Sequence, residues 1–417
     1  MTPLLADAEL AALRTSIEAS LPEYLADLER LVNIDCGSYS PSGVNEVATW
    51  VAAAFERLGA GVERRLDPGG RFGDTVVASF DGSAGDAASG PNILLIGHTD
   101  TVFPDGTAAE RPFRIEDGHA LGPGVSDMKG GLLAGLYALA ALRDVAAGAP
   151  GLGGPGRVTF IANPDEEIGS PSSTPHIRAA AAEADVAFVL EGARANGDFV
   201  SSRKGIIDAR LVVLGRAAHA GVEPEKGRSA ILAGAALVNG IHDLNGRWPG
   251  VTANVGVFRS GIRPNVVPDR AELEVDLRAV TAETLAAARA ALEALAAAPA
   301  LPDVTIELEV THSWAPMEKL ERSGRLVEQA IELAGRIGFQ TRDAATGGAS
   351  DANTTSGAGV PTIDGLGPVG GWDHSPREYL EIASIVPRTT LIAALILATA
   401  RDPVVAAWRA GRASRLG

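Results

Sequence analysis

The feature that most constrains the fold is a short apolar run that ends in a polar turn. Ile93-Leu94-Leu95-Ile96 is followed at once by Gly97-His98-Thr99-Asp100. Consecutive apolar residues without alternation are typical of a strand buried on both faces of a sheet. Open sheets of this kind place their ligands at the carboxyl edge of the strands. We therefore expect an α/β sheet sandwiched by helices, with His98 and Asp100 at its functional edge.

The chain on either side of this run alternates in the same way. Further strands are predicted at 76–80, 157–162 and 186–190, and helices at 10–58 with a break at 35–42, at 129–147 and at 385–401. Strands that alternate with helices predict a mixed sheet flanked by helices. We expect residues 1–203 and 314–417 to form this α/β domain.

The pattern changes between Lys204 and Ser313. The order there is strand, helix, strand, strand, helix, strand, with strands at 206–214, 253–259, 271–279 and 304–311 and helices at 229–244 and 282–298. That order is the split βαβ arrangement of a ferredoxin-like domain. We expect residues 204–313 to form an α+β domain inserted into the larger one.

The composition of the chain argues against several classes of partner, site and location. The 417 residues carry a formal net charge of −16, so a nucleic-acid partner is not expected. Cys36 is the single cysteine, which excludes an internal disulfide framework and a thiolate metal cluster. The first ten residues lack a basic stretch before an apolar run, and the alanine-rich runs are broken by charge or glycine. We expect a cytoplasmic protein without a membrane span.

Histidine and acidic residues stand mostly at predicted strand ends or in the loops that follow them. Besides His98, they are Asp127 in a glycine-rich run, Glu166 and Glu167 after the strand 157–162, Glu191 after 186–190, and His374. Each has an ordinary alternative when taken alone, such as a helix N-cap for Asp127 or a solvated acidic turn for the glutamates. Together, two imidazoles and three or more carboxylates suit zinc, with manganese or cobalt as alternatives.

These residues resemble a known family. The runs 97–102, 122–131 and 165–169, together with His374, are similar in combination to the aminoacylase and carboxypeptidase G metallopeptidases, most of all to the glutamate carboxypeptidase branch. The resemblance runs from about Leu31 to the C-terminus. It implies a metal-dependent exopeptidase or amidohydrolase that releases a C-terminal amino acid, with glutamate as the first candidate. The alternative is an N-acyl amino-acid deacylase, such as an aminoacylase or acetylornithine deacetylase. A metal-free binding protein is disfavoured, because every ligand position is filled.

The resemblance also implies a role for each metal ligand. Asp127 would bridge two divalent cations. His98 and Glu191 would complete one site, and Glu167 and His374 would complete the other.

Two further residues take catalytic roles from the same resemblance. Glu166 would act as the general base, and Asp100 would orient the ring of His98. The peptide bond after the bridging residue, Asp127–Met128, is expected to be cis.

The inserted domain supplies further candidates, and the resemblance implies that it is a lid and dimerisation domain of a homodimer. His219 would donate to the oxyanion from the partner subunit, and Asn265, Arg278 and Gly348 would contact a peptide or N-acyl amino-acid substrate. Without the resemblance, each would be read as a turn residue or a solvated arginine. Glutamate-specific relatives tend to carry arginine where this sequence has His312, so a more apolar amino acid could fit.

Overall fold

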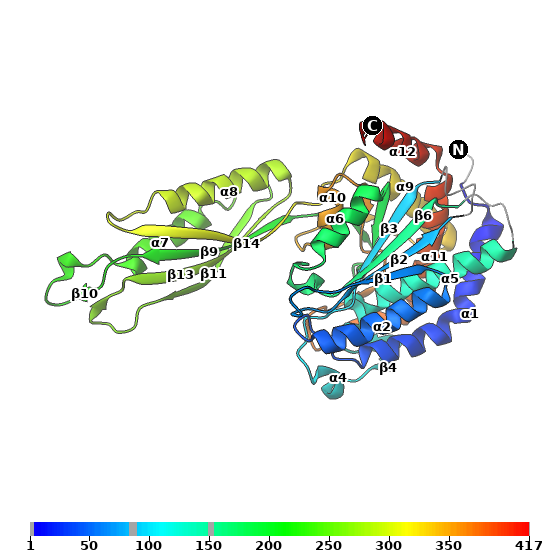
Figure 1. Cartoon of the computed structure of the whole chain (residues 1–417), viewed down its shortest axis with the longest axis horizontal. Coiled ribbons are helices and arrows are strands. Elements are labelled where there is room, and N and C mark those ends of the chain that lie inside the picture. The colour runs from blue at the N-terminus through cyan, green and yellow to red at the C-terminus, as the bar shows by residue number, and fades with distance from the viewer. Residues whose placement is uncertain (1–3, 83–89, 149–153, 417) are drawn as a thin grey trace. The chain divides into compact units, whose positions relative to one another are not determined.

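The computed structural model describes residues 4–82, 90–148 and 154–416 (Figure 1). The chain divides into two compact units. The first comprises Met1–Ser201, Lys319–Ala345 and Ser350–Gly417, and the second comprises Ser202–Glu318 and Thr346–Ala349. The second unit therefore extends beyond the expected range 204–313 at both ends and includes a short later segment.

A six-stranded mixed sheet forms the centre of the first unit. Its order is β1-β2-β6-β3-β7-β16, in which β6, β3, β7 and β16 pair in parallel and β2 alone runs antiparallel to its neighbours β1 and β6. The bounds are β1 Gly61–Arg65, β2 Thr75–Asp81, β3 Asn92–His98, β6 Arg157–Asn163, β7 Val186–Val189 and β16 Thr362–Ile363. The central strands coincide with the apolar runs of the sequence. The polar edge strand β1 was not predicted, because its sequence GVERR shows no apolar pattern.

Helices cover both faces of this sheet. The crossover β3–α5–β6 and the crossover β6–α6–β7 run in opposite directions along the sheet, so their helices lie on opposite faces. Figure 1 shows α1, α2 and α5 on one side and α6 on the other. The helices are α1 Asp7–Val32, α2 Pro41–Arg57, α4 Thr107–Glu110, α5 Gly130–Gly148, α6 Thr174–Glu183, α9 Glu321–Ile337, α10 Asp351–Gly357, α11 Ile382–Arg401 and α12 Pro403–Leu416.

Two apolar helices of this unit lie in its core. Val125–Val145, which includes most of α5, and α11 are long and apolar enough to cross a membrane by length and composition. Most of each is buried inside the unit, where α1, α5 and α11 pack against one another. This is the setting of core helices.

Short strands complete the first unit. One small sheet has the order β17-β18-β5-β4, with β4 Arg114–Glu116, β5 His119–Leu121, β17 Gly370–Gly371 and β18 Tyr379–Glu381. A further two-stranded sheet pairs β8 (Phe199–Arg203) with β15 (Asp343–Thr346), and the division between the two units falls within both strands.

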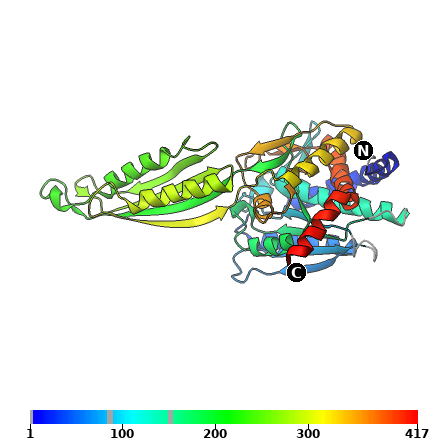
Figure 2. The ribbon, with the colours of Figure 1, turned by 90° about the horizontal axis from the view of Figure 1, so that it is seen from above.

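The second unit is built on an antiparallel sheet of order β11-β13-β9-β14. Helices α7 and α8 lie on the same side of it (Figures 1 and 2). Burial alternates along β13, which is expected of a sheet with one covered face. The bounds are β9 Gly205–Leu214, α7 Ala230–His242, β11 Thr252–Ser260, β13 Arg270–Ala279, α8 Ala282–Ala297 and β14 Thr305–Trp314, with β10 Ala218–His219 paired to β12 Val266–Val267.

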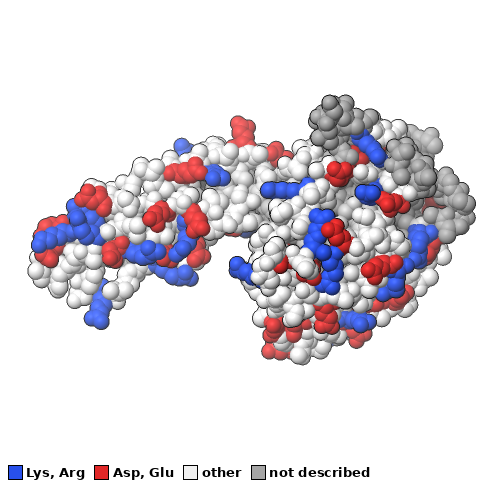
Figure 3. All heavy atoms as spheres, in the orientation of Figure 1, with Lys and Arg blue, Asp and Glu red and all other residues white. Residues whose placement is uncertain are grey.

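The surface charge is mixed in sign. On the face in Figure 3, acidic and basic side chains are interspersed over each unit. Although the net charge is −16, the acidic side chains on this face do not form one continuous acidic patch.

Candidate metal centre

Three parallel strands bring polar side chains to one edge of the large sheet. His98 ends β3 and lies in register with Asn163, which ends β6, and Glu191 follows β7. The next strand of this sheet along the chain, β6, lies on one side of β3, and the strand after that, β7, lies on the other side. The direction in which strands are added to the sheet therefore reverses at β3. Such a reversal opens a crevice at the carboxyl ends of the strands, where α/β proteins bind ligands. Glu166 and Glu167 follow β6 by only a few residues and reach the same edge.

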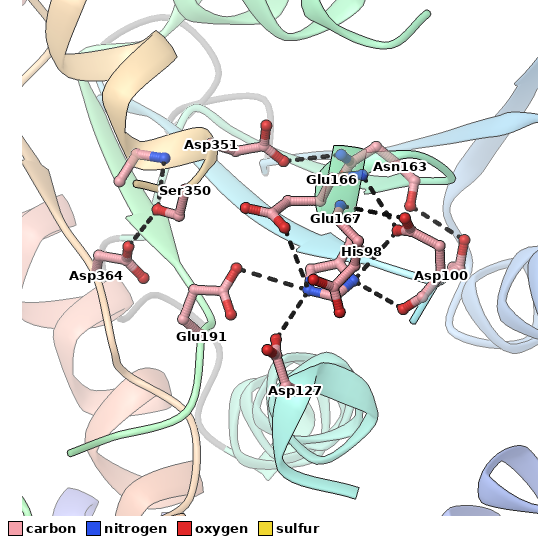
Figure 4. Close-up of polar contacts among 12 residues, drawn as sticks. His98, Asp100, Asp127, Asn163, Glu166, Glu167, Glu191, Ser350, Asp351 and Asp364 are labelled. Carbon is pink, nitrogen blue, oxygen red and sulfur yellow. Dashed lines mark hydrogen bonds and ion pairs between the residues drawn. The ribbon is translucent and has the colours of Figure 1, made fainter. Parts of the chain in front are cut away.

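The ring of His98 is buried and oriented by Asp100 (Figure 4). Its Nδ1 lies 3.0 Å from the backbone oxygen of Asp100 and 3.3 Å from Oδ1 of the same residue. Because both neighbours are acceptors, Nδ1 donates to them, and a neutral ring would then present the lone pair of Nε2 to a metal ion in the crevice. This is the tautomer that a metal-ligating histidine needs.

Asp100 is itself held by three donors. The backbone N–H groups of Glu166 and Glu167 donate to its two carboxylate oxygens at 3.2 Å each, and the hydroxyl of Ser38 donates at 2.6 Å. One fully buried carboxylate therefore fixes the His98 ring and the backbone of both glutamates. The sequence suggested only the contact with His98.

Asp127 stands between the two histidines. Its Oδ1 lies 3.2 Å from Nε2 of His98, and its Oδ2 lies 3.1 Å from Nε2 of His374. Nε2 of His374 also lies 3.1 Å from Oε2 of Glu167. The Asp127–Met128 peptide bond is cis, as the resemblance implied. One carboxylate thus faces a different imidazole with each of its oxygens, which is the arrangement of a bridging ligand.

A glycine allows the Asp127 loop to come this close. A Cβ on Gly131, in the first turn of α5, would lie 1.8 Å from the backbone oxygen of Leu190. Only glycine permits that approach of helix to strand end. The close packing brings the start of α5 beside the end of the β7 segment, and Asp127 and Glu191 both approach Nε2 of His98 although they come from different elements.

The carboxylates crowd around His98. Its Nε2 lies 3.8 Å from Oε1 of Glu191 and 4.0 Å from Oε2 of Glu166. Burial, together with the negative charges nearby, raises the pKa of Glu166 well above its usual value and the pKa of Glu167 to about 7. A cation among these oxygens would remove the repulsion.

The donor set fits divalent metal ions. Ligand atoms of His98, Asp127 and Glu167 lie within 4.8 Å of one another, and so do those of His98, Glu166 and Glu191. Imidazole nitrogen with carboxylate oxygen suits zinc, manganese or cobalt.

Two of the candidates in the second unit lie next to each other. His219 in β10 is opposite Val266 in β12, and the N–H of Ala220 donates to the backbone oxygen of Asn265 at 3.0 Å. Both candidate side chains are exposed.

The other two candidates are Gly348, within the segment Thr346–Ala349, and Arg278, which contacts that segment. Arg278 donates to both carboxylate oxygens of Asp276 and to the backbone oxygen of Gly347, the last at 2.8 Å. The backbone oxygen of Gly348 accepts a hydrogen bond from Arg203. Arg278 therefore already has a carboxylate partner within its own strand.

His312 lies differently from the sequence expectation. Strand β14 continues to Trp314 instead of stopping at Thr311, so His312 is inside the strand, where it is paired in register with Asp208. Its Nδ1 lies 3.5 Å from the Asp208 carboxylate. The sequence placed the strand end too early because the polar residues after Val310 break the apolar alternation.

Two buried acidic residues near the site were not singled out from the sequence. Asp351 accepts hydrogen bonds from Asn163 at 2.8 Å and from the hydroxyl of Ser170 at 2.6 Å. Glu378 accepts from three backbone N–H groups of the loop that carries Asp127. Sequence offered no signal for Glu378, since a glutamate beside an arginine predicts a solvated turn.

Comparison with known proteins places this geometry in a family. The model of the peptidase family M20/M25/M40 matches residues 94–398, which include every candidate metal ligand. The chain belongs to this family.

Two similar proteins and one similar structure match most of this chain. It is 32% identical over 382 residues to carboxypeptidase G2 of Pseudomonas sp. (strain RS-16), covering 90% of this chain and 89% of the relative. It is 29% identical over 377 residues to the succinyl-diaminopimelate desuccinylase of Methylobacterium sp. (strain 4-46), covering 84% and 90%. Its fold is similar to that of the M20 family metallo-carboxypeptidase Sso-CP2 from Sulfolobus solfataricus, with a TM-score of 0.70, 18% identity and coverage of 90% and 98%.

Membership of the M20/M25/M40 family confirms the prediction that the protein is a hydrolase of the metallopeptidase class. Enzymes of this class depend on metal, and the histidine and carboxylate cluster at the sheet edge is a place where this chain can bind it. The mixed α/β architecture is likewise confirmed.

Proposed function

We propose that this protein is an exopeptidase that binds two divalent cations and hydrolyses an amide bond to release a C-terminal amino acid. The observation that supports this most directly is the position of Asp127, whose two oxygens each face one histidine. In the proposal, Asp127 bridges the cations, His98 and Glu191 complete one site, and Glu167 and His374 complete the other. Zinc is the first candidate for both cations, with manganese or cobalt as alternatives.

Each side chain at the sheet edge then has a defined task. Paired cations, when bound, acidify a water and stabilise negative charge on the scissile carbonyl. Glu166 takes a proton from that water and delivers it to the leaving nitrogen. Burial raises the pKa of Glu166, which favours proton uptake by this carboxylate. Asp100 accepts from Nδ1 of His98 and so directs Nε2 at the site, where a neutral ring would bind a cation.

Substrate recognition is proposed for the second unit on the strength of the family resemblance. Arg278 would bind the substrate carboxylate through its planar guanidinium, exchanging or sharing its present partner Asp276. Asn265 and the backbone at Gly348 would contact the remainder of the substrate. His219 would donate to the developing oxyanion from the partner subunit. The unit would thereby act as a lid and dimerisation domain.

The released amino acid is tested by a substrate panel. The protein should hydrolyse peptidyl-, folyl- or aminobenzoyl-type amides of glutamate or of a more apolar amino acid faster than N-acetyl or N-succinyl amino acids. The panel is run with zinc, manganese and cobalt in parallel, and kcat/KM is measured for each pair. Preference for small N-acyl groups would instead favour a deacylase, the activity named for the desuccinylase relative.

A homodimer is proposed through the edge strands or a helix of the second unit. Strands β11 and β14 end the four-stranded sheet, and unpaired strand edges favour pairing across a twofold axis. Apolar side chains exposed near β11 and α7 add to this surface: Ile231, Leu232 and Phe258.

Light scattering coupled to gel filtration checks the oligomeric state. At micromolar concentration the measured mass should be twice that of the 42.7 kDa chain. A monomer would argue against the dimer and against His219 acting in the partner's site.

A cytoplasmic location remains a prediction, and cell fractionation would check it.

A further inference from the structure

Glu378 is a buried carboxylate that makes its contacts with backbone rather than with solvent. Its side chain lies in the loop between β17 and β18, and the residue is only 2% exposed. Oε1 accepts from the N–H groups of Ser126 and Asp127 at 2.8 and 3.0 Å, and Oε2 accepts from the N–H of Gly124 at 2.9 Å. Three N–H groups of one loop therefore converge on a single carboxylate.

The contacted loop leads directly into α5. Its N–H groups lie before a helix of 19 residues, where peptide dipoles favour a negative charge. The hydrogen bonds from Gly124 and Ser126 are buried and the one from Asp127 is part-buried, so loss of the carboxylate would leave buried donors without their acceptor. The carboxylate thus determines where the backbone of Asp127 lies.

The same short hairpin also carries His374. Gly370 pairs with Leu380 and Gly371 with Tyr379, so the loop of residues 372–378 is closed at its base. His374 has a positive φ of 60°, which gives the loop a specific shape. At one point the loop contacts Oδ2 of Asp127 through His374, and four residues later it contacts the N–H of Asp127 through Glu378.

We propose that Glu378 is a positioning residue that sets the distance between Asp127 and His374 and thereby the affinity for the second of the two cations. This inference rests on the proposed two-cation site. Two of the three proposed ligands of that second cation depend on Glu378. Asp127 donates its backbone N–H to Glu378, and His374 lies in the same loop of residues 372–378. The first cation depends on it less, because two of its three ligands, His98 and Glu191, come from the end of β3 and the residues after β7 rather than from the hairpin or the Asp127 loop.

Glutamine in place of Glu378 should separate the two binding steps. Glu378→Gln keeps the shape, but its NH₂ group would face backbone N–H donors where a carboxylate oxygen now accepts. We expect the cation held by Asp127, Glu167 and His374 to bind about 10–100-fold less tightly, the range seen when partners of metal ligands are removed. The other cation should stay within about 3-fold of its wild-type affinity.

The experiment titrates metal-free protein with cobalt(II) alone and follows its visible absorption and calorimetric heat. Glu378→Asp keeps the charge on a shorter side chain and should fall between wild type and Glu378→Gln; it also serves if the glutamine variant does not fold. Glu381→Gln, three residues later and half-buried, is the matched control and should bind both ions normally. The unfolding midpoint of each metal-free protein is measured in parallel.

The outcomes separate this inference from the proposed function. Wild-type protein that binds fewer than two cobalt ions would overturn the two-cation site itself. Two ions bound by the wild type, with both affinities unchanged in Glu378→Gln, would overturn only the positioning role. An equal loss of both affinities together with a lower metal-free midpoint would also overturn it, because Glu378 would then stabilise the unit as a whole.

Discussion

Replacing Glu166 with glutamine is expected to lower kcat by about 10²–10⁴-fold while both cations stay bound. Glutamine is nearly isosteric, but it cannot accept a proton from water or return it to the leaving nitrogen. The proposed ligands of the cations do not include Glu166, whose Oε2 lies 4.0 Å from Nε2 of His98. Turnover of the best panel substrate and metal content by mass spectrometry are the two measurements.

The neighbouring residue provides the control. Glu167 lies 3.1 Å from His374 and is a proposed ligand, so Glu167→Gln should reduce metal content as well as turnover. The two substitutions are chemically the same and one position apart. If Glu166→Gln kept wild-type kcat, the general base would have to be another residue; if it lost metal, Glu166 would be a ligand.

Replacing Asp127 with alanine is expected to have the largest effect on the site. The substitution removes the carboxylate that faces both His98 and His374, so neither cation would keep its full ligand set. Metal content should fall from two ions to at most one per chain, and turnover should become undetectable. Wild-type protein should also be stabilised by added metal by about 2.7 kcal/mol per site at a free concentration 100 times the Kd.

Thermal unfolding with and without zinc measures this difference. The Asp127→Ala variant should lose most of the metal-dependent shift in Tm while keeping a similar midpoint without metal. Asp144→Ala is the matched control, since Asp144 lies on the helix that follows the loop and its side chain is exposed beside Arg143. Retention of two ions by Asp127→Ala would remove the basis of the bridging assignment.

Together, the Glu166 and Asp127 experiments distinguish a residue that transfers protons from a residue that binds metal. Loss of turnover with metal retained identifies a residue that moves protons, whereas loss of both identifies a ligand. Glu166 and Asp127 are predicted to fall on opposite sides of that division, although both are acidic residues at the same edge of one sheet.

Local sequence determined the elements of this protein and the identity of its candidate ligands. The apolar run before His98 predicted β3, and the order of strands and helices after Lys204 matches the sheet β11-β13-β9-β14 with its two helices. These patterns are readable because burial repeats over a few residues within one element. Polar strands such as β1 carry no such repeat and were missed.

Tertiary structure alone decided how the ligands meet. Side chains as far apart in the chain as His98, Asp127 and His374 are neighbours because β3 lies between β6 and β7 and because Gly131 lets α5 approach the strand ends. The contact of Glu378 with the Asp127 loop also depends on this packing. Apolar periodicity records which face of an element is buried, but it holds no information on which distant element covers that face, and it is this choice that sets the distances at the site.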